Sequence, residues 1–442
     1  MSGLASVLLA KGARVSGSDL AENREVRGLR RAGAEVHVGH DPRLVTGDLD
    51  GVIVSSAIDG ENAEVAAART QGIPIVRRLD AMARLLRGHR SIGVAGTHGK
   101  TTTSAMVATI LRGASRSPSF LIGAHCPGLG GNAHLGSGEW FVAEIDESDG
   151  LLVSVDADVA VLTNMGCDHL QTYGDFSAIQ RAFGQYVGRA KQAVLSIDDP
   201  NVARLAEMLD NPLTVGIEPG AKLRATNLTH ERFHTAFDLL ARGRRITRVN
   251  LPAPGRHNVR NALCALGAAM LAGIDLGDAA RALEGFTLPH RRFELLEENG
   301  VTVVDDYAHL PEEIEATLNA IRSGWPDRRI VAVFQPHRFS RTQRLGREFG
   351  KAFTLAHSVI VTSIYPACEP PLPGVTSRTI VDAVGRETSA EVHSISDKAR
   401  AIDHLKRTIV PGDFIISFGA GDIWTVTEEL ACFLEAGNFV TA

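Results

Sequence analysis

The chain has few cysteines, no long apolar stretch and no excess of positive charge. Its five cysteines are widely spaced and form no CxxC pair, which argues against a disulfide framework or a structural zinc site and fits a reducing cytoplasm. Because no run of about 18 apolar residues is present, no membrane span is expected. The net charge of −5, without a basic run, gives no electrostatic footprint for nucleic acid. We therefore expect a soluble, cytoplasmic protein.

The length of 442 residues exceeds what one hydrophobic core usually serves, so two or three domains are expected. Short apolar runs that read as buried strands alternate with helical patterns, which is typical of α/β domains with parallel sheets. The first segment ends near residue 88, the second begins at the apolar run SIGVAG, and the third begins near residue 290. The expected domains are therefore 1–88, 89–290 and 291–442.

The stretch SIGVAGTHGKTTT, residues 91–103, is the most informative part of the sequence. An apolar strand runs into a turn made tight by Gly96 and Gly99, and a helix is expected to start at Lys100. Such a turn binds an anion through backbone N–H groups, with the lysine on the β- and γ-phosphates of a nucleotide and Thr101 on Mg²⁺. The strict Walker pattern fails because position 94 is Val, but a shorter GTxGKT form fits. The alternative is an ordinary strand–turn–helix whose lysine is solvated.

Acidic residues follow the apolar strand FVAEID, where they are candidates for the metal ligands that a phosphate loop requires. They are Glu144, Asp146, Glu147 and Asp149. The next strand, VAVLTNM, leads to Asn164, Asp168 and His169, which we expect at the same edge of the sheet. Acids directly after a buried strand favour a metal site, and the alternatives are a solvated acidic loop and a structural histidine.

Seven motifs together resemble the Mur ligase family: GTHGKTTT, EIDESDG, TNMGCDHLQTYGDF, GRHNVRNAL, DDYAHLPEEI, QPHRFSRT and GAGDI. They occur in this order and cover nearly the whole chain. The resemblance implies three α/β domains: a Rossmann-like N-terminal domain for a UDP-sugar, a central P-loop ATPase domain with a mostly parallel sheet, and a Rossmann-like C-terminal domain for the incoming amino acid and part of ATP. It also implies that ATP and Mg²⁺ activate a carboxylate as an acyl phosphate, which an amine then attacks.

The resemblance also assigns roles to individual positions. The ATP-binding set is Gly96, Thr97, His98, Gly99, Lys100, Thr101, Thr102, His257, Asn258, Asn261, Arg292, Asp306 and Tyr307. The catalytic set is Lys100, Glu144, His169, His309, Arg338 and Arg341. The metal set is Thr101, Glu144 and His169. The UDP-sugar-binding set is Ser18, Asp19, Ser56, Glu147 and Ser148.

Simpler interpretations exist for several of these positions. His257, Asn258 and Asn261 also fit helix capping and surface polarity, and Arg292 also fits a plain surface charge. The motif QPHRFSRT also fits a solvated loop at a strand end. An arginine fork nevertheless suits bidentate recognition of a carboxylate, the role that the resemblance gives to this motif.

Further details resemble the alanine-adding branch of the family. They are His98 in the loop, DESDG after the metal glutamate, PGVTS at 373–377 and GAGDI at 419–423. This resemblance implies ligation of L-alanine to the lactyl carboxylate of UDP-N-acetylmuramate, a step of peptidoglycan precursor synthesis. We also expect the chain to be a monomer or a weak dimer. The alternatives are a recycling relative that adds a tripeptide, folylpolyglutamate synthase, a simple phosphotransferase, and a nucleotide-binding switch protein without catalysis.

Two features depart from the family pattern. YAHLP has Leu310 where a second histidine is usual, and the chain opens at MSGLA, without the strand and most of the glycine-rich turn that cradle the UDP diphosphate. The first domain is therefore expected to lack a central parallel strand, which leaves backbone groups of its neighbours unpaired. We expect the natural chain to carry about 10–20 further residues, the length of one strand and a turn.

Overall fold

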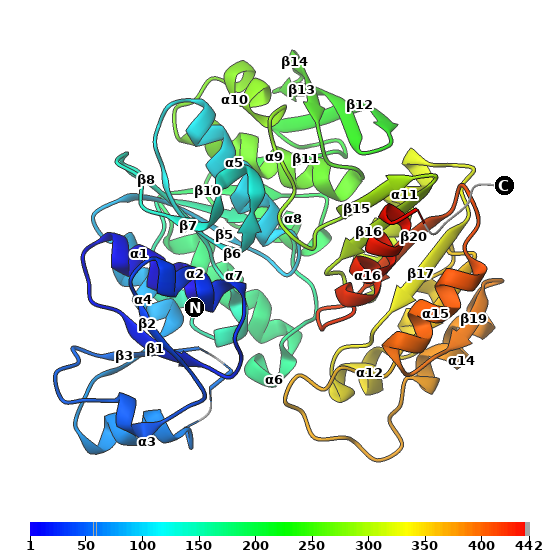
Figure 1. Ribbon diagram of the computed structural model, residues 1–442. Coiled ribbons are helices and arrows are strands. Elements are labelled where there is room, and N and C mark those ends of the chain that lie inside the picture. The colour runs from blue at the N-terminus through cyan, green and yellow to red at the C-terminus, as the bar shows by residue number, and fades with distance from the viewer. Residues whose placement is uncertain (56, 59, 438–442) are drawn as a thin grey trace. The chain divides into compact units, whose positions relative to one another are not determined.

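Figure 1 shows the computed structural model, which describes residues 1–55, 57–58 and 60–437. Contacts within the chain define two units. The first comprises Met1–Leu228, Phe237–Leu251 and Val259–Thr287, and the second comprises Thr229–Ala236, Pro252–Asn258 and the chain from Leu288 onward. The first unit contains most of the first two expected domains, and the domain boundaries near residues 88 and 290 stay predictions.

The N-terminal region of the first unit is built from short elements. They are α1 (Ser2–Ala10), β1 (Ser16–Asp19), α2 (Arg24–Arg31), β2 (Glu35–Val38), η1 (Pro42–Leu44), β3 (Val52–Val54), α3 (Ala63–Thr70), β4 (Ile75–Arg77) and α4 (Arg78–Leu86). β1 pairs in parallel with β2, and β3 with β4. Among the described residues no strand joins these two sheets, as expected for a domain without its central strand. Leu4 of α1 and Leu79 of α4 share a core with Phe141, so this region packs on the central sheet.

The central region forms a sheet of ten strands in the order β14-β13-β12-β11-β10-β9-β5-β8-β6-β7. The strands are β5 (Arg90–Ala95), β6 (Ser119–Cys126), β7 (Gly131–His134), β8 (Trp140–Glu144), β9 (Val159–Leu162), β10 (Gln192–Ser196), β11 (Leu213–Gly216), β12 (Leu223–Glu231), β13 (His234–Ala241) and β14 (Arg244–Leu251). The helices are α5 (Lys100–Gly113), α6 (Leu170–Tyr173), α7 (Phe176–Arg189), α8 (Pro200–Glu207), α9 (Arg256–Leu271) and α10 (Leu276–Leu283), and the 3₁₀ turns are η2 (Pro127–Leu129), η3 (Glu147–Asp149) and η4 (Leu152–Ser154).

Parallel pairing dominates the middle of this sheet, as predicted. The run β6-β8-β5-β9-β10-β11 is parallel throughout. Strands covered on both faces read as continuous apolar runs, and β5, β8 and β9 are accordingly buried along nearly their whole lengths. This burial explains why the runs SIGVA, WFVA and VAVL were recognisable as strands in the sequence.

The second unit contains a sheet of six strands in the order β15-β16-β20-β17-β18-β19 (Figure 1). The strands are β15 (Glu294–Asn299), β16 (Val301–Asp306), β17 (Ile330–Phe334), β18 (Ser358–Val361), β19 (Glu391–Ser394) and β20 (Phe414–Phe418). The helices are α11 (Pro311–Gly324), α12 (Phe339–Leu345), α13 (Glu348–Ala352), α14 (Arg378–Glu387), α15 (Lys398–Thr408) and α16 (Trp424–Glu435). All pairs are parallel except β15 with β16.

Side chains in this sheet alternate strictly between two cores, because successive residues of a strand face opposite sides. Ala332 and Phe334 of β17 pack with α11, α13 and α14, whereas Val331 and Val333 pack with α15 and α16. Helices therefore cover both faces, and the expected doubly wound α/β fold is confirmed. No helix among the described residues is long and apolar enough to cross a bilayer.

Candidate active site

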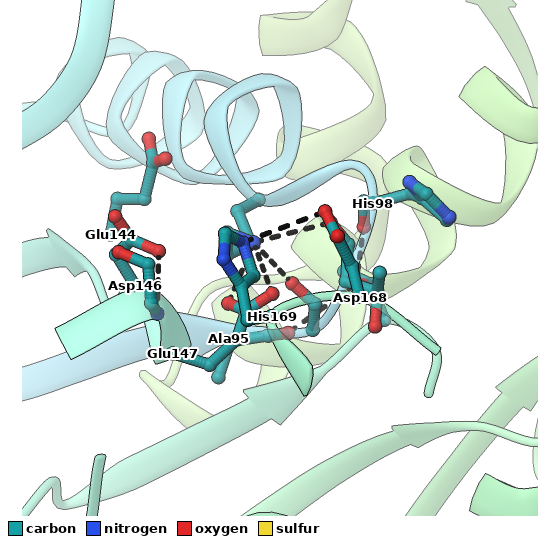
Figure 2. A network of polar contacts seen from close by, with 12 residues as sticks. Ala95, His98, Glu144, Asp146, Glu147, Asp168 and His169 are labelled. Carbon is teal, nitrogen blue, oxygen red and sulfur yellow. Dashed lines mark hydrogen bonds and ion pairs between the residues drawn. The ribbon is translucent and has the colours of Figure 1, made fainter. Parts of the chain in front are cut away.

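Three neighbouring parallel strands of the central sheet end at one place. In the pairing register Val94 of β5 lies beside Glu144 of β8, and Ala95 lies beside Leu162 of β9. The phosphate loop after β5, the acidic turn after β8 and the loop after β9 therefore start from the same edge of the sheet. Figure 2 shows side chains from all three segments in one polar network. The predicted convergence of these motifs is confirmed as geometry.

The phosphate loop needs both of its glycines. Gly96 and Gly99 have φ values of +134° and +81°, in the region that favours glycine. A Cβ at Gly96 would overlap the hydroxyl of Thr163, and a Cβ at Gly99 would overlap the side-chain amide of Asn261. The loop backbone is thus approached closely from two sides, and α5 begins directly after it at Lys100, as predicted.

The loop after β9 holds the phosphate loop in place through its backbone. The N–H of His98 donates to Oδ1 of Asn164 at 2.9 Å, and the carbonyl of His98 accepts from the hydroxyl of Thr163 at 2.6 Å. The hydroxyl of Thr97 accepts from the N–H of Gly166 at 2.7 Å. These bonds fix the path of the loop.

Lys100 is engaged by an acid of the neighbouring strand end. Its Nζ donates to the two carboxylate oxygens of Glu147 at 3.0 and 2.8 Å, and to the carbonyls of Gly96 and Thr97 at 2.6 and 3.2 Å. Burial opposes the charged ammonium, but the attraction of Glu147, Asp146 and Glu144 outweighs it and raises the pKa of Lys100 above its usual range. The lysine is therefore a cation that is shielded from water and paired with a carboxylate.

Two groups of residues at this edge are suited to a divalent cation. The hydroxyl of Thr101 donates to Glu144 at 3.1 Å, and Glu144 also accepts from the N–H of Gly123 at 2.7 Å. Ligand atoms of Asp146, Glu147 and His169 all lie within 4.8 Å of one another. Carboxylates and a hydroxyl beside a phosphate loop fit Mg²⁺. The structure thus joins Thr101 to Glu144, and it groups His169 with Asp146 and Glu147. That Thr101, Glu144 and His169 bind one metal ion together stays a prediction.

His169 has an unusual backbone. Its φ of +55° lies in the left-handed region, which a residue other than glycine enters at a cost of roughly 1–3 kcal/mol. Its Nε2 lies 3.6 Å from a carboxylate oxygen of the buried Asp168. Such strain is typical of functional sites, and it turns the imidazole from the end of β9 towards the acidic turn.

Sequence reasoning missed Arg78, the first residue of α4. Its guanidinium lies 3.0 Å from Asp146 and 3.4 Å from Asp149. Burial of Asp146 opposes its ionisation, yet Lys100 and Arg78 together hold the pKa of this carboxyl below its usual range. The segment VRRLDAM carries no spacing that marks Arg78, so only the fold reveals it.

The predicted nucleotide residues on α9 differ in their surroundings. The side-chain amide of Asn261 lies against Gly99 of the phosphate loop, and Asn261 is buried. The amide of Asn258 donates to the carbonyl of Pro254 at 2.8 Å, just before α9 begins. His257 lies beside Gly255, close to the start of the helix. Their roles toward a nucleotide stay predictions.

The predicted residues of the second unit gather where β16 and β17 end. Asp306 is buried and accepts from the N–H groups of Phe293 at 3.1 Å and Ala308 at 2.8 Å. Burial raises its pKa to about 6 from the ordinary 3.8. The guanidinium of Arg292 lies over the ring of Tyr307, 4.7 Å from its centroid. The structure therefore brings Arg292, Asp306 and Tyr307 together.

Aromatic rings form a ladder at the same strand ends. The ring of His309 lies 5.3 Å from Tyr307 and 5.7 Å from His337, and His337 stacks on Tyr365 at 5.6 Å, each measured between ring centroids. The guanidinium of Arg341 approaches Nδ1 of His337 at 3.1 Å. Sequence reasoning missed Tyr365, which a backbone bridge attaches to His337.

Arg338 and Leu310 complete this picture. Arg338 has a φ of +71°, and its guanidinium lies 3.7 Å from Glu369. Its backbone N–H donates to the carbonyl of Tyr365 at 2.8 Å. Leu310, which departs from the usual histidine, is buried directly before the start of α11. An apolar side chain suits that position, and His309 alone points into the ladder.

The predicted UDP-sugar residues lie in separate places. The hydroxyl of Ser18 donates to Glu64 at 2.9 Å and lies 2.9 Å from Nδ1 of His40, two partners that the sequence did not mark. Asp19 is exposed at the end of β1, whereas the N–H of Ser148 donates to Asp146 at 3.1 Å. Ser56 lies outside the described residues. The UDP-sugar role of this set stays a prediction.

Comparison with known proteins places these motifs in context. Three models of one family match the chain: "Mur ligase family, catalytic domain" over residues 1–90, "Mur ligase middle domain" over 94–269, and "Mur ligase, glutamate ligase domain" over 291–421. A UDP-N-acetylmuramate–L-alanine ligase from Geobacter sp. (strain M21) is 41% identical over 99% of this chain and 96% of its own length. The enzyme of the same name from Solidesulfovibrio magneticus is 42% identical over 96% of this chain and 94% of its own length.

A solved structure agrees with this placement. The crystal structure of a UDP-N-acetylmuramate-alanine ligase from Thermotoga maritima superposes with a TM-score of 0.85 and 28% identity, covering 99% of this chain and 97% of that one. The three family models follow one another in the order of the expected domains and together span most of the sequence. With relatives above 40% identity along nearly its full length, the chain belongs to the Mur ligase family.

Proposed function

We propose that this chain is an ATP-dependent ligase that joins L-alanine to the lactyl carboxylate of UDP-N-acetylmuramate, a step of peptidoglycan precursor synthesis. One observation carries the chemistry: a glycine-rich loop with a buried, charged Lys100 meets the acidic end of β8 at one sheet edge. The relatives at 41 and 42% identity carry the name of this alanine ligase, which supports the choice of substrates.

In this proposal the phosphate loop binds the triphosphate of ATP. Backbone N–H groups at the N-terminus of α5 face the phosphates, and Lys100 contacts the transferred group. Asn261, packed against Gly99, holds the loop from the side of α9. Preorganised donors of this kind stabilise the charge that develops as the γ-phosphoryl group moves.

Mg²⁺ fits the residues at this edge. Thr101 and Glu144 are already in hydrogen-bond contact, and His169 lies in the adjacent group of ligand atoms. We propose Thr101, Glu144 and His169 as its protein ligands. When bound, the ion neutralises phosphate charge and lowers the repulsion that an attacking carboxylate meets.

The reaction then follows from the groups present. A carboxylate oxygen of the sugar attacks the γ-phosphorus of ATP, the bond to the bridging oxygen breaks, and ADP leaves. The product of this step is an acyl phosphate. The neutral amine of L-alanine attacks its carbonyl carbon, inorganic phosphate leaves, and the nitrogen gives up one proton to the leaving phosphate or to water as the amide forms. His309, Arg338 and Arg341 are proposed to hold carboxylates, since a guanidinium fork binds them bidentately. Asp306, Tyr307 and Arg292 are proposed on the nucleotide. Because the reaction consumes ATP, we propose a cytoplasmic location.

The experiment that tests this function is release of ADP by the full chain in the presence of UDP-N-acetylmuramate. A panel of L-alanine, glycine, L-serine and the tripeptide L-alanyl-γ-D-glutamyl-meso-diaminopimelate separates the branches of the family. The proposal expects product of the mass of the alanyl sugar and turnover that depends on L-alanine. Turnover only with the tripeptide would instead identify a recycling ligase, and nucleotide binding without amide product would identify a switch protein.

A further inference from the structure

The phosphate-loop lysine of this chain does not project freely from its loop. Its ammonium is surrounded by two carbonyls of the loop itself, those of Gly96 and Thr97, and by both oxygens of Glu147. The Lys100 and Glu147 side chains are 12% and 3% exposed, so the pair is shielded from water. In this arrangement the hydrogen-bonding capacity of the lysine is already used.

The turn that carries Glu147 is anchored from several sides. Arg78 holds Asp146 and Asp149, which flank the glutamate in sequence. The hydroxyl of Tyr173 donates to the carbonyl of Glu147 at 2.8 Å, and the hydroxyl of Thr172 donates to the carbonyl of Ser148 at 3.1 Å. Glu147 is therefore presented to Lys100 by a turn that is held from several sides.

A triphosphate and Glu147 compete for the same ammonium. A buried carboxylate needs a partner, and so does a buried ammonium, because either charge alone is costly away from water. Lys100 has no spare donors for a phosphate while it bonds the loop carbonyls and Glu147. Binding of phosphate to Lys100 thus requires exchange of one anionic partner for another.

We propose that Glu147 is the resting counter-ion of Lys100, and that a nucleotide binds by displacing it. Glu147 thereby keeps the lysine charged and positioned when the site holds no nucleotide, and it weakens nucleotide affinity by the strength of the contact that must break. It is a positioning residue that acts through Lys100. The inference rests on the proposed function only in taking Lys100 as the phosphate-binding lysine.

The test is a titration of the full chain with two probes, ADP and inorganic tripolyphosphate, by calorimetry with and without Mg²⁺. Tripolyphosphate lacks the nucleoside and reports on the phosphate loop alone. Glu147→Gln keeps the shape but removes the charge, and we expect it to bind tripolyphosphate about tenfold more tightly, the value of one charged hydrogen bond. A merely structural role predicts weaker binding in the same variant.

Asp149→Asn is the matched control. It removes one negative charge from the same turn, but Asp149 pairs with Arg78 and not with Lys100. If the loss of any negative charge in this turn were enough, Asp149→Asn and Glu147→Gln would tighten tripolyphosphate binding equally. The counter-ion role instead predicts that Asp149→Asn changes the affinity about twofold or less, as for a screened neighbouring charge. Equal tightening in both variants contradicts the proposal.

Glu147→Asp provides a second variant if the amide does not fold. It keeps the charge but withdraws the carboxylate by one methylene, so the contact lengthens and binding of tripolyphosphate is expected to tighten by about threefold. Wild-type chain that binds neither probe overturns both the proposed function and this inference. If the wild type binds ADP but the Glu147 variants bind tripolyphosphate no more tightly than the wild type does, only the counter-ion role is overturned.

Discussion

At the end of β8 buried carboxylates are balanced by the side-chain cations Lys100 and Arg78, whereas at the end of β16 the buried Asp306 is held by backbone N–H groups and a hydroxyl. A side-chain cation can leave one carboxylate for another anion through rotation of a few bonds. A backbone donor stays where the fold puts it. The first arrangement is therefore exchangeable and the second is fixed.

The same contrast extends to the neighbours of each acid. Around β8 two cations flank two neighbouring carboxylates: Arg78 pairs with Asp146, and Lys100 pairs with Glu147. Around β16 and β17 the polar groups are joined by aromatic rings, with Tyr307, His309 and His337 in edge-on contact. The first edge suits phosphate and metal ions, whose charge must be matched, and the second suits planar groups that stack or accept an arginine fork.

The largest predicted effect is a loss of activity at the end of β8, where the carboxylates pair with side-chain cations. Lys100→Ala removes the cation that meets the transferred phosphoryl group, and we expect kcat/KM for ADP release to fall at least about 1,000-fold, or about 4 kcal/mol of transition-state stabilisation. Circular dichroism and thermal melting of the variant check that the fold survives. Lys191→Ala, at an exposed lysine of the same unit, is the control and should change the rate less than about twofold. Residual activity above a tenth of the wild type would falsify the role of Lys100.

The next predicted effect is a pH dependence of the free energy of unfolding that arises from Asp306 at the end of β16. Burial raises the pKa of Asp306 to about 6, so the folded chain binds this proton more tightly than the unfolded chain does. The stabilisation is complete below pH 4 and is lost as pH rises through about 6, on the order of 3 kcal/mol in all.

Asp306→Asn should remove this dependence, because the amide does not titrate. The measurement is the free energy of unfolding of the second unit's transition in urea at pH 4 and pH 7, for both proteins. The wild type should lose more stability than the variant across this range. An identical loss in both would mean that the burial of Asp306 does not favour its protonated form.

A smaller effect is expected from Arg341, which is buried beside His337. Arg341→Lys keeps the charge but loses the planar fork, and we expect kcat/KM for L-alanine to fall about 30-fold, or about 2 kcal/mol. Arg344→Lys, at the exposed residue one turn further along α12, should stay within about twofold. Equal behaviour of the two variants would remove Arg341 from the proposed carboxylate site.

The smallest effect is one of packing at the fixed edge. A Cβ at Gly421 would overlap the side chains of Gln335 and Tyr365, so Gly421→Ala should lower the free energy of unfolding by about 1–2 kcal/mol. Gly385→Ala in α14 has open space around it and should instead raise stability by about 0.5–1 kcal/mol. Thermal melting of both variants gives the comparison. A stable Gly421→Ala would show that the loop carrying Tyr365 yields easily.

The strands that end at functional edges were predictable from sequence because they are buried on both faces. The runs at β5, β8 and β9 read as apolar strands in the sequence, and polar residues follow each of them. β12, β13 and β14 were not predicted, since each has several exposed or half-buried positions and lacks a continuous apolar run. The strength of the signal thus follows the burial of the strand.

Within the site, the sequence predicted which residues gather but not how they pair. The convergence of Lys100, Glu144 and the acidic turn follows from strand order, which the motif series implies. The pairing of Lys100 with Glu147, three positions beyond Glu144, depends on the path of the turn and on Arg78 from a distant helix. Likewise Tyr365 lies 28 positions from His337, and the two residues meet through a backbone bridge and a ring contact between two loops. Contacts between loops of different strands carry no local pattern.

The backbone bridge between His337 and Tyr365 has a practical consequence. The two loops are held by main-chain hydrogen bonds, from Tyr365 to the carbonyl of Pro336 and from Arg338 to the carbonyl of Tyr365, each 2.8 Å long. Their paths are therefore set by groups that every residue except proline possesses. Libraries randomised at positions 337 and 365 would keep these main-chain bonds while altering the side chains that the two loops display.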